Sequence, residues 1–170
     1  IVDLVRNRRW RKLKLHSKLM LLMTPGLLLL GTLMFWLLEH NNPATFGNAG
    51  PGGQLLAAFF QSATARTAGF NTVDIGQMVP ASLLFMMMLM FIGAGATSTG
   101  GGIKVTTFAV VLLATRAFLT KRPHVTAFGR TLSPQIVTRS LAIIIVSVMV
   151  LMLAMFLLML TESQPFDKIM

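Results

Sequence analysis

Three long apolar runs, with a polar, glycine-containing strip between the first and the second, constrain the fold more than any other feature of this sequence. The runs are Leu19–Leu38, the interrupted stretch Pro80–Leu119 and Leu141–Leu160. About 20 apolar residues are enough for a helix to cross the roughly 30 Å hydrocarbon core of a bilayer. Hydrophobic residues make up 54% of the 170 and charged residues 12%, which is too apolar for a soluble domain of this size. The sequence therefore predicts an all-α membrane protein.

The distribution of charge predicts the orientation of these spans. The segment before the first run is strongly basic, the connection to the second run holds almost no Lys or Arg, and the connection to the third is basic again. Lys and Arg accumulate on the cytoplasmic side of membranes. Before the second run we expect a cytoplasmic segment (1–18), a transmembrane helix (19–38) and an external loop (39–52). After it we expect a cytoplasmic loop (120–132), a transmembrane helix (133–160) and an external segment (161–170).

The connection between the first two runs contains an apolar, charge-free segment that is too short to span a membrane. As a helix, residues 53–65 would reach only about 20 Å at about 1.5 Å per residue. We expect a re-entrant half-helix that enters the membrane and stops inside it. Its carboxyl end, the negative end of the helix dipole, would favour a cation.

The polar strip, residues 66–72, follows directly. Irregular backbone at membrane depth must be buried in protein or line a water-filled cavity, because lipid cannot bond to its N–H and C=O groups. The strip therefore suggests an ion pathway. Arg66 stands at its start, where its head group would either bond backbone carbonyls or reach the outer surface, and we expect a structural role.

The second run, residues 80–119, is too long for one straight span and is interrupted by glycines. Each glycine inside a helix costs about 1 kcal/mol relative to alanine, so we expect a broken transmembrane helix with an intramembrane loop at 93–102. This loop is not a phosphate-binding loop, because Gly101 stands where such a loop requires lysine. Lys104 would either extend to the membrane interface or place a positive charge at a gate.

Other function classes find little support. The basic residues lie beside apolar spans and do not alternate with exposed aromatics, so we expect no nucleic-acid binding. The run Met86–Met88, with Met90, has no His, Cys or carboxylate beside it and is interpreted as packing. The five acidic residues are scattered, so the sequence offers no catalytic constellation and we expect no enzyme.

Two motifs resemble the Trk/Ktr/HKT superfamily of potassium transporters, most closely its bacterial Trk and Ktr membrane subunits. They are residues 62–75, Ser-Ala-Thr-Ala-Arg-Thr-Ala-Gly-Phe-Asn-Thr-Val-Asp-Ile, and residues 95–107, Gly-Ala-Thr-Ser-Thr-Gly-Gly-Gly-Ile-Lys-Val-Thr-Thr. Both are similar to the third of the superfamily's four repeats, and the last run is similar to the start of the fourth. The resemblance implies a potassium-channel-like repeat of helix, re-entrant pore helix with filter loop, and broken helix.

The resemblance also implies roles for individual residues. Gly69 would be the characteristic glycine of the filter, whose backbone carbonyls replace the hydration shell of K⁺. The K⁺-binding carbonyls would belong to Thr67, Ala68, Gly69 and Phe70. The filter would be supported by Arg66, Asn71 and Thr72. The gate loop would comprise Gly95, Ala96, Thr97, Ser98, Thr99, Gly100, Gly101, Gly102 and Lys104.

The function implied by the resemblance is potassium uptake across the bacterial inner membrane, through a pore built from four repeats. Potassium would be the transported ligand, with no covalently bound cofactor. The chain, which starts at Ile1, is interpreted as a fragment. Its partners would be the remaining repeats of the parent polypeptide, a second copy of the full subunit in a homodimer, a cytosolic nucleotide-binding regulatory subunit and membrane lipid. The basic segment 116–139 would face either that regulatory subunit or anionic lipid.

Two alternatives compete with this function. One is a channel subunit that forms homotetramers from single repeats. Such channels resemble Thr-Val-Gly-Tyr-Gly, whereas here Asn71 follows Phe70 in place of a second glycine. The other is a membrane scaffold without transport, for which the half-helix and the glycine loop would have no purpose.

Overall fold

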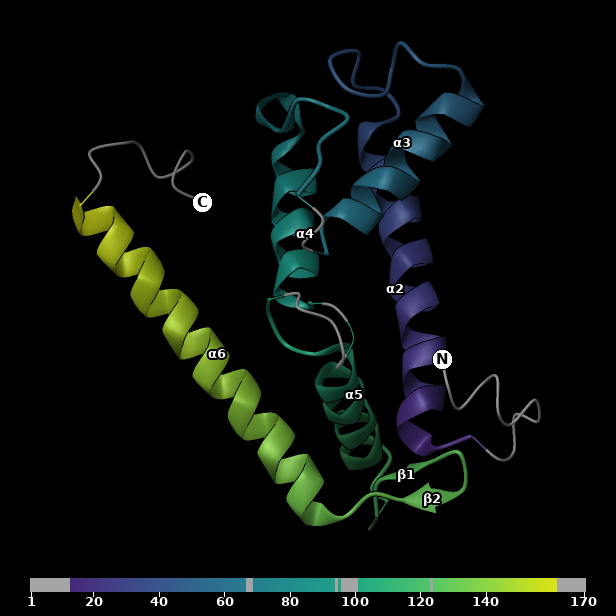
Figure 1. The fold of residues 1–170 in the computed structure, drawn as a ribbon, viewed down its shortest axis with the longest axis vertical. Coiled ribbons are helices and arrows are strands. Elements are labelled where there is room, and N and C mark those ends of the chain that lie inside the picture. The colour runs from purple at the N-terminus through teal and green to yellow at the C-terminus, as the bar shows by residue number, and fades with distance from the viewer. Residues whose placement is uncertain (1–12, 67–68, 94, 96–100, 123, 162–170) are drawn as a thin grey trace. The chain divides into compact units, whose positions relative to one another are not determined.

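The computed structural model describes residues 13–66, 69–93, 95, 101–122 and 124–161 (Figure 1). Helices account for most of this described part. In chain order the elements are α2 (Leu15–Glu39), α3 (Pro51–Thr64), the short 3₁₀ helix η2 (Ile75–Gln77), α4 (Pro80–Phe91), α5 (Val105–Leu119), β1 (Thr126–Ala127), β2 (Arg130–Thr131) and α6 (Pro134–Thr161). The chain forms two compact units, residues 1–109 and 110–170, which are described separately below.

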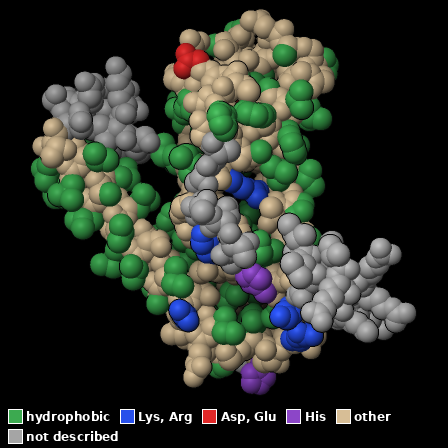
Figure 2. Space-filling view, viewed as in Figure 1, with side chains coloured by type: hydrophobic (Ala, Val, Ile, Leu, Met, Phe, Trp, Pro, Cys, Tyr) green, Lys and Arg blue, Asp and Glu red, His purple; other side chains and the backbone are tan. Residues whose placement is uncertain are grey.

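Within the described residues, α2 and α6 are each long and apolar enough to cross a membrane. They contain 25 and 28 residues, which corresponds to lengths of about 37 and 42 Å. Large apolar side chains on α6, such as Leu153 and Leu160, are 58% and 67% exposed, and apolar side chains cover its visible face (Figure 2). Exposed apolar surface on this scale marks contact with lipid or another protein. Together these features are those of a helical membrane protein.

The remaining helices are too short to span a bilayer. α3, α4 and α5 contain 14, 12 and 15 residues, or about 21, 18 and 22 Å. Proline occupies the first turn of both α3 and α4, where its fixed φ favours the helix and its missing N–H costs nothing. α4 and α5 are separate helices, and the glycine-rich segment lies between them.

A two-stranded hairpin, absent from the all-α expectation, lies in the second unit. Ala127 pairs with Arg130 across an antiparallel register. The two residues between them, Phe128 and Gly129, have φ of 51° and 75°, and two-residue hairpin turns with positive φ at both positions match the twist of the strands. Phenylalanine rarely adopts this conformation, so the sequence carries no turn signal of the Asn-Gly kind.

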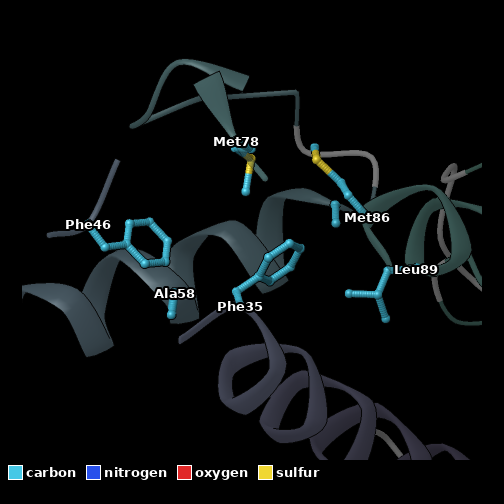
Figure 3. Packing of buried hydrophobic residues seen from close by; sticks show 7 residues of the cluster. Phe35, Phe46, Ala58, Met78, Met86 and Leu89 are labelled. Carbon is cyan, nitrogen blue, oxygen red and sulfur yellow. The ribbon is translucent and has the colours of Figure 1, made fainter. Parts of the chain in front are cut away.

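A buried apolar cluster holds the first unit together (Figure 3). It joins α2, α3 and α4 with the segments between them, and it comprises Phe35, Phe46, Ala58, Ala65, Met78, Met86 and Leu89. Phe35 is completely buried, and its ring meets that of Phe85 edge to face, with centroids 5.4 Å apart. Edge-to-face pairs add about 0.5–1.5 kcal/mol beyond the apolar area they bury. The cluster fixes the position of the short helix α3 against α2.

α2 and α3 approach most closely at Gly31. A Cβ atom at this position would overlap Ser62 Oγ, and Ser62 Oγ donates a hydrogen bond of 2.9 Å to the Leu28 carbonyl of α2. Small residues let helix backbones come close in membranes, and serine hydroxyls then bond across the interface. Glycine is therefore required at position 31, because a larger side chain would not fit between α2 and α3.

We expect Gly31→Val to lower the free energy of unfolding by about 1–3 kcal/mol, the usual cost of overpacking a tight contact. The matched control is Gly26→Val on the same helix, because a Cβ at Gly26 would meet nothing within 4 Å. The measurement is the midpoint of thermal unfolding of both variants in detergent. Equal midpoints would contradict the close approach of α2 and α3.

Candidate functional site

The carboxyl end of α3 leads directly into the polar strip. Thr64, the last residue of α3, is 5% exposed, and Ala65 is 1% exposed. The chain then turns at Arg66, whose N–H donates to the Ala63 carbonyl at 3.2 Å. In contrast, Phe70 is 71% exposed. The strip therefore emerges from a buried helix end and presents its second half at the surface of this chain.

Thr64 ties the strip back to the helix. The backbone N–H of Phe70 donates to Thr64 Oγ1 at 3.2 Å, and Thr64 Oγ1 donates to the Phe70 carbonyl at 2.5 Å. One hydroxyl thus closes the loop 64–70 and fixes both backbone groups of Phe70. The sequence predicts Thr64 only as part of the half-helix, because nothing in the local pattern shows where its hydroxyl points.

Gly69 lies inside this closed loop with φ of 77°. A residue with a Cβ pays about 1–2 kcal/mol in this left-handed region. A Cβ built at Gly69 would meet nothing within 4 Å, so the requirement for glycine comes from the backbone and not from crowding. The predicted ligands Thr67 and Ala68 lie outside the described residues.

The other residues of the strip have little regular structure. Asn71 and Thr72 are exposed, and neither they nor Arg66, Gly69 and Phe70 belong to a β-strand. In the part of the chain that the structure describes, no three His, Asp or Glu side chains gather where they could hold a metal ion.

Arg66 links the start of the strip to α2. Its Nη1 donates to the Thr24 carbonyl at 3.2 Å, across 42 positions of sequence, and its side chain is half-buried. This contact is the first of the two arrangements considered for its head group. It joins the strip to α2 beside Pro25, the proline inside that helix.

Glu39, which belongs to neither sequence motif, holds together one end of the first unit. It is the last residue of α2 and is completely buried. Its carboxylate accepts hydrogen bonds from Asn42 Nδ2 at 2.8 Å, Thr45 Oγ1 at 2.7 Å and the backbone N–H of Val79 at 2.8 Å. Val79 is the N-cap of α4, so one carboxylate holds the end of α2, the following loop and the start of α4 together. In the sequence, the signal for this role is an acidic residue at the end of an apolar span, with two asparagines shortly after it.

The glycine loop between α4 and α5 has a closed neck. The Ile103 N–H donates to the Phe91 carbonyl at 2.9 Å, and Ile92 and Ile103 form a parallel bridge. Gly102 has φ of 76°, and a Cβ there would lie 2.7 Å from the Phe91 oxygen. Glycine is needed at this point because backbone lies against backbone.

The opposite side of the neck is equally tight, since a Cβ on Gly93 would overlap the Gly101 carbonyl oxygen. Lys104 follows the neck, is half-buried, and its carbonyl accepts the Phe108 N–H of α5 at 3.1 Å. Gly95 is described and half-buried. The remaining predicted loop residues, Ala96, Thr97, Ser98, Thr99 and Gly100, lie outside the described residues.

The described residues contain two helices that are long and apolar enough to cross a membrane, a short helix that leads into an irregular glycine strip, and a pair of helices separated by a glycine neck. These features support a helical membrane protein. The family model for TrkH, described as cation transport protein, matches residues 6–169. The chain belongs to this family, whose members are transporters and not enzymes.

Comparison with known proteins gives the same result. The chain is 60% identical over 167 residues to the Ktr system potassium uptake protein B of Vibrio alginolyticus, covering 96% of this chain and 37% of that protein. It is 40% identical over 169 residues to the protein of the same name from Bacillus subtilis, covering 99% and 38%. It is 36% identical over 163 residues to the potassium/sodium uptake protein NtpJ of Enterococcus hirae, covering 96% and 36%. The chain thus spans little more than a third of the length of these relatives.

Proposed function

We propose that the protein takes up potassium across the bacterial inner membrane, and that this chain supplies one filter strand and the intramembrane gate loop of a pore built from four repeats. The observation that carries the proposal is the conformation of Gly69. Its φ of 77° lies in a strip that Thr64 closes onto the end of a helix too short to span the bilayer. The names of the relatives, which include two potassium uptake proteins, support the choice of ion.

The filter would work through backbone carbonyls and the helix behind them. The carbonyls of Thr67, Ala68, Gly69 and Phe70 would replace the hydration shell of K⁺. The Phe70 carbonyl accepts the Thr64 hydroxyl, and its second lone pair stays available for the ion. The carboxyl end of α3 would add the negative end of its dipole. Arg66, Asn71 and Thr72 would hold the strip in place from outside the ion path.

The gate would be the loop above the glycine neck. Gly95–Gly102 would obstruct the pathway below the filter, and Lys104 would set its charge or its position. Residues 1–18 and 120–132 would face the cytoplasm, where a nucleotide-binding regulatory subunit would act on a homodimer of the full subunit. The remaining repeats of the parent polypeptide would supply the other three filter strands, with membrane lipid around them and no nucleic acid.

A homotetramer of single repeats is the alternative. The relatives match 96–99% of this chain. The match covers only 36–38% of the length of each relative, so the relatives extend well beyond it. Several repeats in one polypeptide therefore account for the match better than a single-repeat subunit does.

A complementation experiment tests the proposal. We expect the full-length transporter that contains this chain to restore growth of a bacterium lacking potassium uptake at low K⁺, and this chain expressed alone to give no growth, because one filter strand cannot surround an ion. Membrane insertion of both proteins is the control. Failure of an inserted full-length protein would contradict potassium uptake, and growth with the chain alone would favour the homotetramer.

A further inference from the structure

The second unit contains a small basic pocket whose lining residues belong neither to the filter strip, nor to the gate loop, nor to the Glu39 network. The pocket has a volume of about 130 Å³ and is lined by residues of the end of α5, of the turn after it and of β1. Figure 1 shows these segments of backbone next to one another. Arg116, Arg122 and His124 line it, together with Thr120 and Thr126. Five side chains with hydrogen-bond donors thus surround one cavity, two of them permanently cationic.

The turn after α5 brings the two arginines together. Lys121 has φ of 50°, and its N–H donates to the Phe118 carbonyl at 3.0 Å. The N–H of Arg122 donates to the Ala117 carbonyl at 2.9 Å. This pair of bonds around a left-handed residue is a Schellman motif, which ends a helix and folds the chain back over its last turn. Arg122 is therefore held beside Arg116, which lies six residues earlier in the sequence.

The same turn removes the groups that would repel an anion. The last carbonyls of a helix carry partial negative charge, but those of Ala117 and Phe118 are occupied by the motif. The Arg116 carbonyl accepts both the N–H of Thr120 at 3.0 Å and its hydroxyl at 2.7 Å. Residues 105–161 also contain no Asp or Glu. The described residues of this unit therefore offer no acidic side chain that could neutralise the cations of the pocket.

The position of the pocket selects the anion. It opens at the end of an apolar helix, beside Phe118 and Leu119, which are 82% and 75% exposed. In a membrane protein such side chains lie against acyl chains, so the arginines next to them stand at the depth of the lipid headgroups. Basic pockets at this level bind anionic headgroups, and an arginine fork matches two phosphate oxygens.

We propose that this pocket binds the phosphate of an anionic phospholipid. Arg116 and Arg122 donate to its oxygens from two sides, and His124 and the threonine hydroxyls complete the donors. The bound lipid holds the end of α5 against the hairpin. No residue proposed for the filter or the gate loop lines this pocket, so the lipid proposal does not depend on which ion the protein carries.

The test uses the full-length transporter purified in detergent and stripped of lipid. Phosphatidylglycerol is added, and bound lipid is counted by native mass spectrometry. We expect the variant Arg116→Gln/Arg122→Gln to weaken binding at one site by about tenfold, because two charge-assisted contacts are lost. Arg130→Gln/Arg139→Gln removes the same charge from outside the pocket and should leave that site unchanged. Arg122→Gln alone, at an exposed position, is the second variant and should give a smaller loss in a protein that still folds.

Three results would overturn the proposal. Equal loss in the two double variants would mean diffuse attraction between a basic surface and acidic lipid. Displacement of the lipid by millimolar inorganic phosphate, or equal binding of phosphatidylcholine, would mean that the pocket does not select an anionic lipid. Lipid binding that is unchanged in both pocket variants, with weaker binding of a cytosolic partner protein, would assign the pocket to a protein interface.

Discussion

Gly69→Ala lowers potassium uptake by the full-length transporter about tenfold or more, which is the larger of the two strongest effects we expect. Alanine pays about 1–2 kcal/mol in the left-handed region, and Gly69 adopts φ of 77° inside the loop that Thr64 closes. The strain is relieved only by rotating the peptide planes on either side. Those planes carry the carbonyls that the proposal assigns to K⁺.

The matched control for this variant is Gly76→Ala. Gly76 lies a few residues downstream, its φ is not in the left-handed region, and a Cβ there would meet Asp74 Oδ1 at an ordinary 3.4 Å. Uptake of rubidium by cells is measured for both variants and divided by the amount of protein in the membrane. Equal uptake by the two variants would contradict the assignment of Gly69 to the filter. Gly69→Asp should abolish growth at low K⁺ as well, because it adds a charged side chain at the same position.

Gly102→Ala raises potassium flux several-fold, the second large effect. The substitution combines left-handed strain at φ of 76° with a Cβ placed 2.7 Å from the Phe91 oxygen, and such a contact forces the backbone to move. The bond from the Ile103 N–H to the Phe91 carbonyl would open, and the two sides of the neck would separate. A loop released from its neck no longer obstructs the pathway in one defined position.

The neighbouring glycine provides the control. A Cβ on Gly101 would meet nothing within 4 Å, so Gly101→Ala should keep the flux of the parent protein. Deletion of Gly95–Gly102 removes the loop itself and should raise flux at least as far as Gly102→Ala does. Flux is measured as K⁺ efflux from vesicles that contain equal amounts of inserted protein. Unchanged or lower flux in the deletion variant would count against a gate at this loop.

The sequence predicts the helices of this protein better than it predicts their contacts. The sequence predicts a half-helix at 53–65, and the structure has a helix at Pro51–Thr64. It predicts the last helix at 133–160, and the structure has a helix at Pro134–Thr161. The first helix begins at Leu15, four residues before the expected start at 19. Its first turn includes the polar residues His16 and Lys18, which hydropathy assigns to the aqueous side.

The hairpin and the hydrogen bonds of Glu39 show why the sequence does not predict the other elements and contacts. The hairpin depends on a phenylalanine in a conformation that favours glycine or asparagine, so no rule of turn composition finds it. Glu39 looks like one more charge at the end of a span. Its role follows from Val79, 40 residues away, and pattern analysis reads neighbours along the chain rather than in space.

By itself the sequence predicted a membrane location, the order of the apolar helices within the described residues and the two glycine segments, because hydropathy and glycine content act locally and need no partner. Only the tertiary structure decided how these segments are held. Thr64 meets Phe70, Arg66 meets Thr24 and Gly31 makes room for Ser62 because the apolar cluster sets α3 against α2. A hydrogen bond across 42 residues has no counterpart in local composition, since it exists only once two helices have packed.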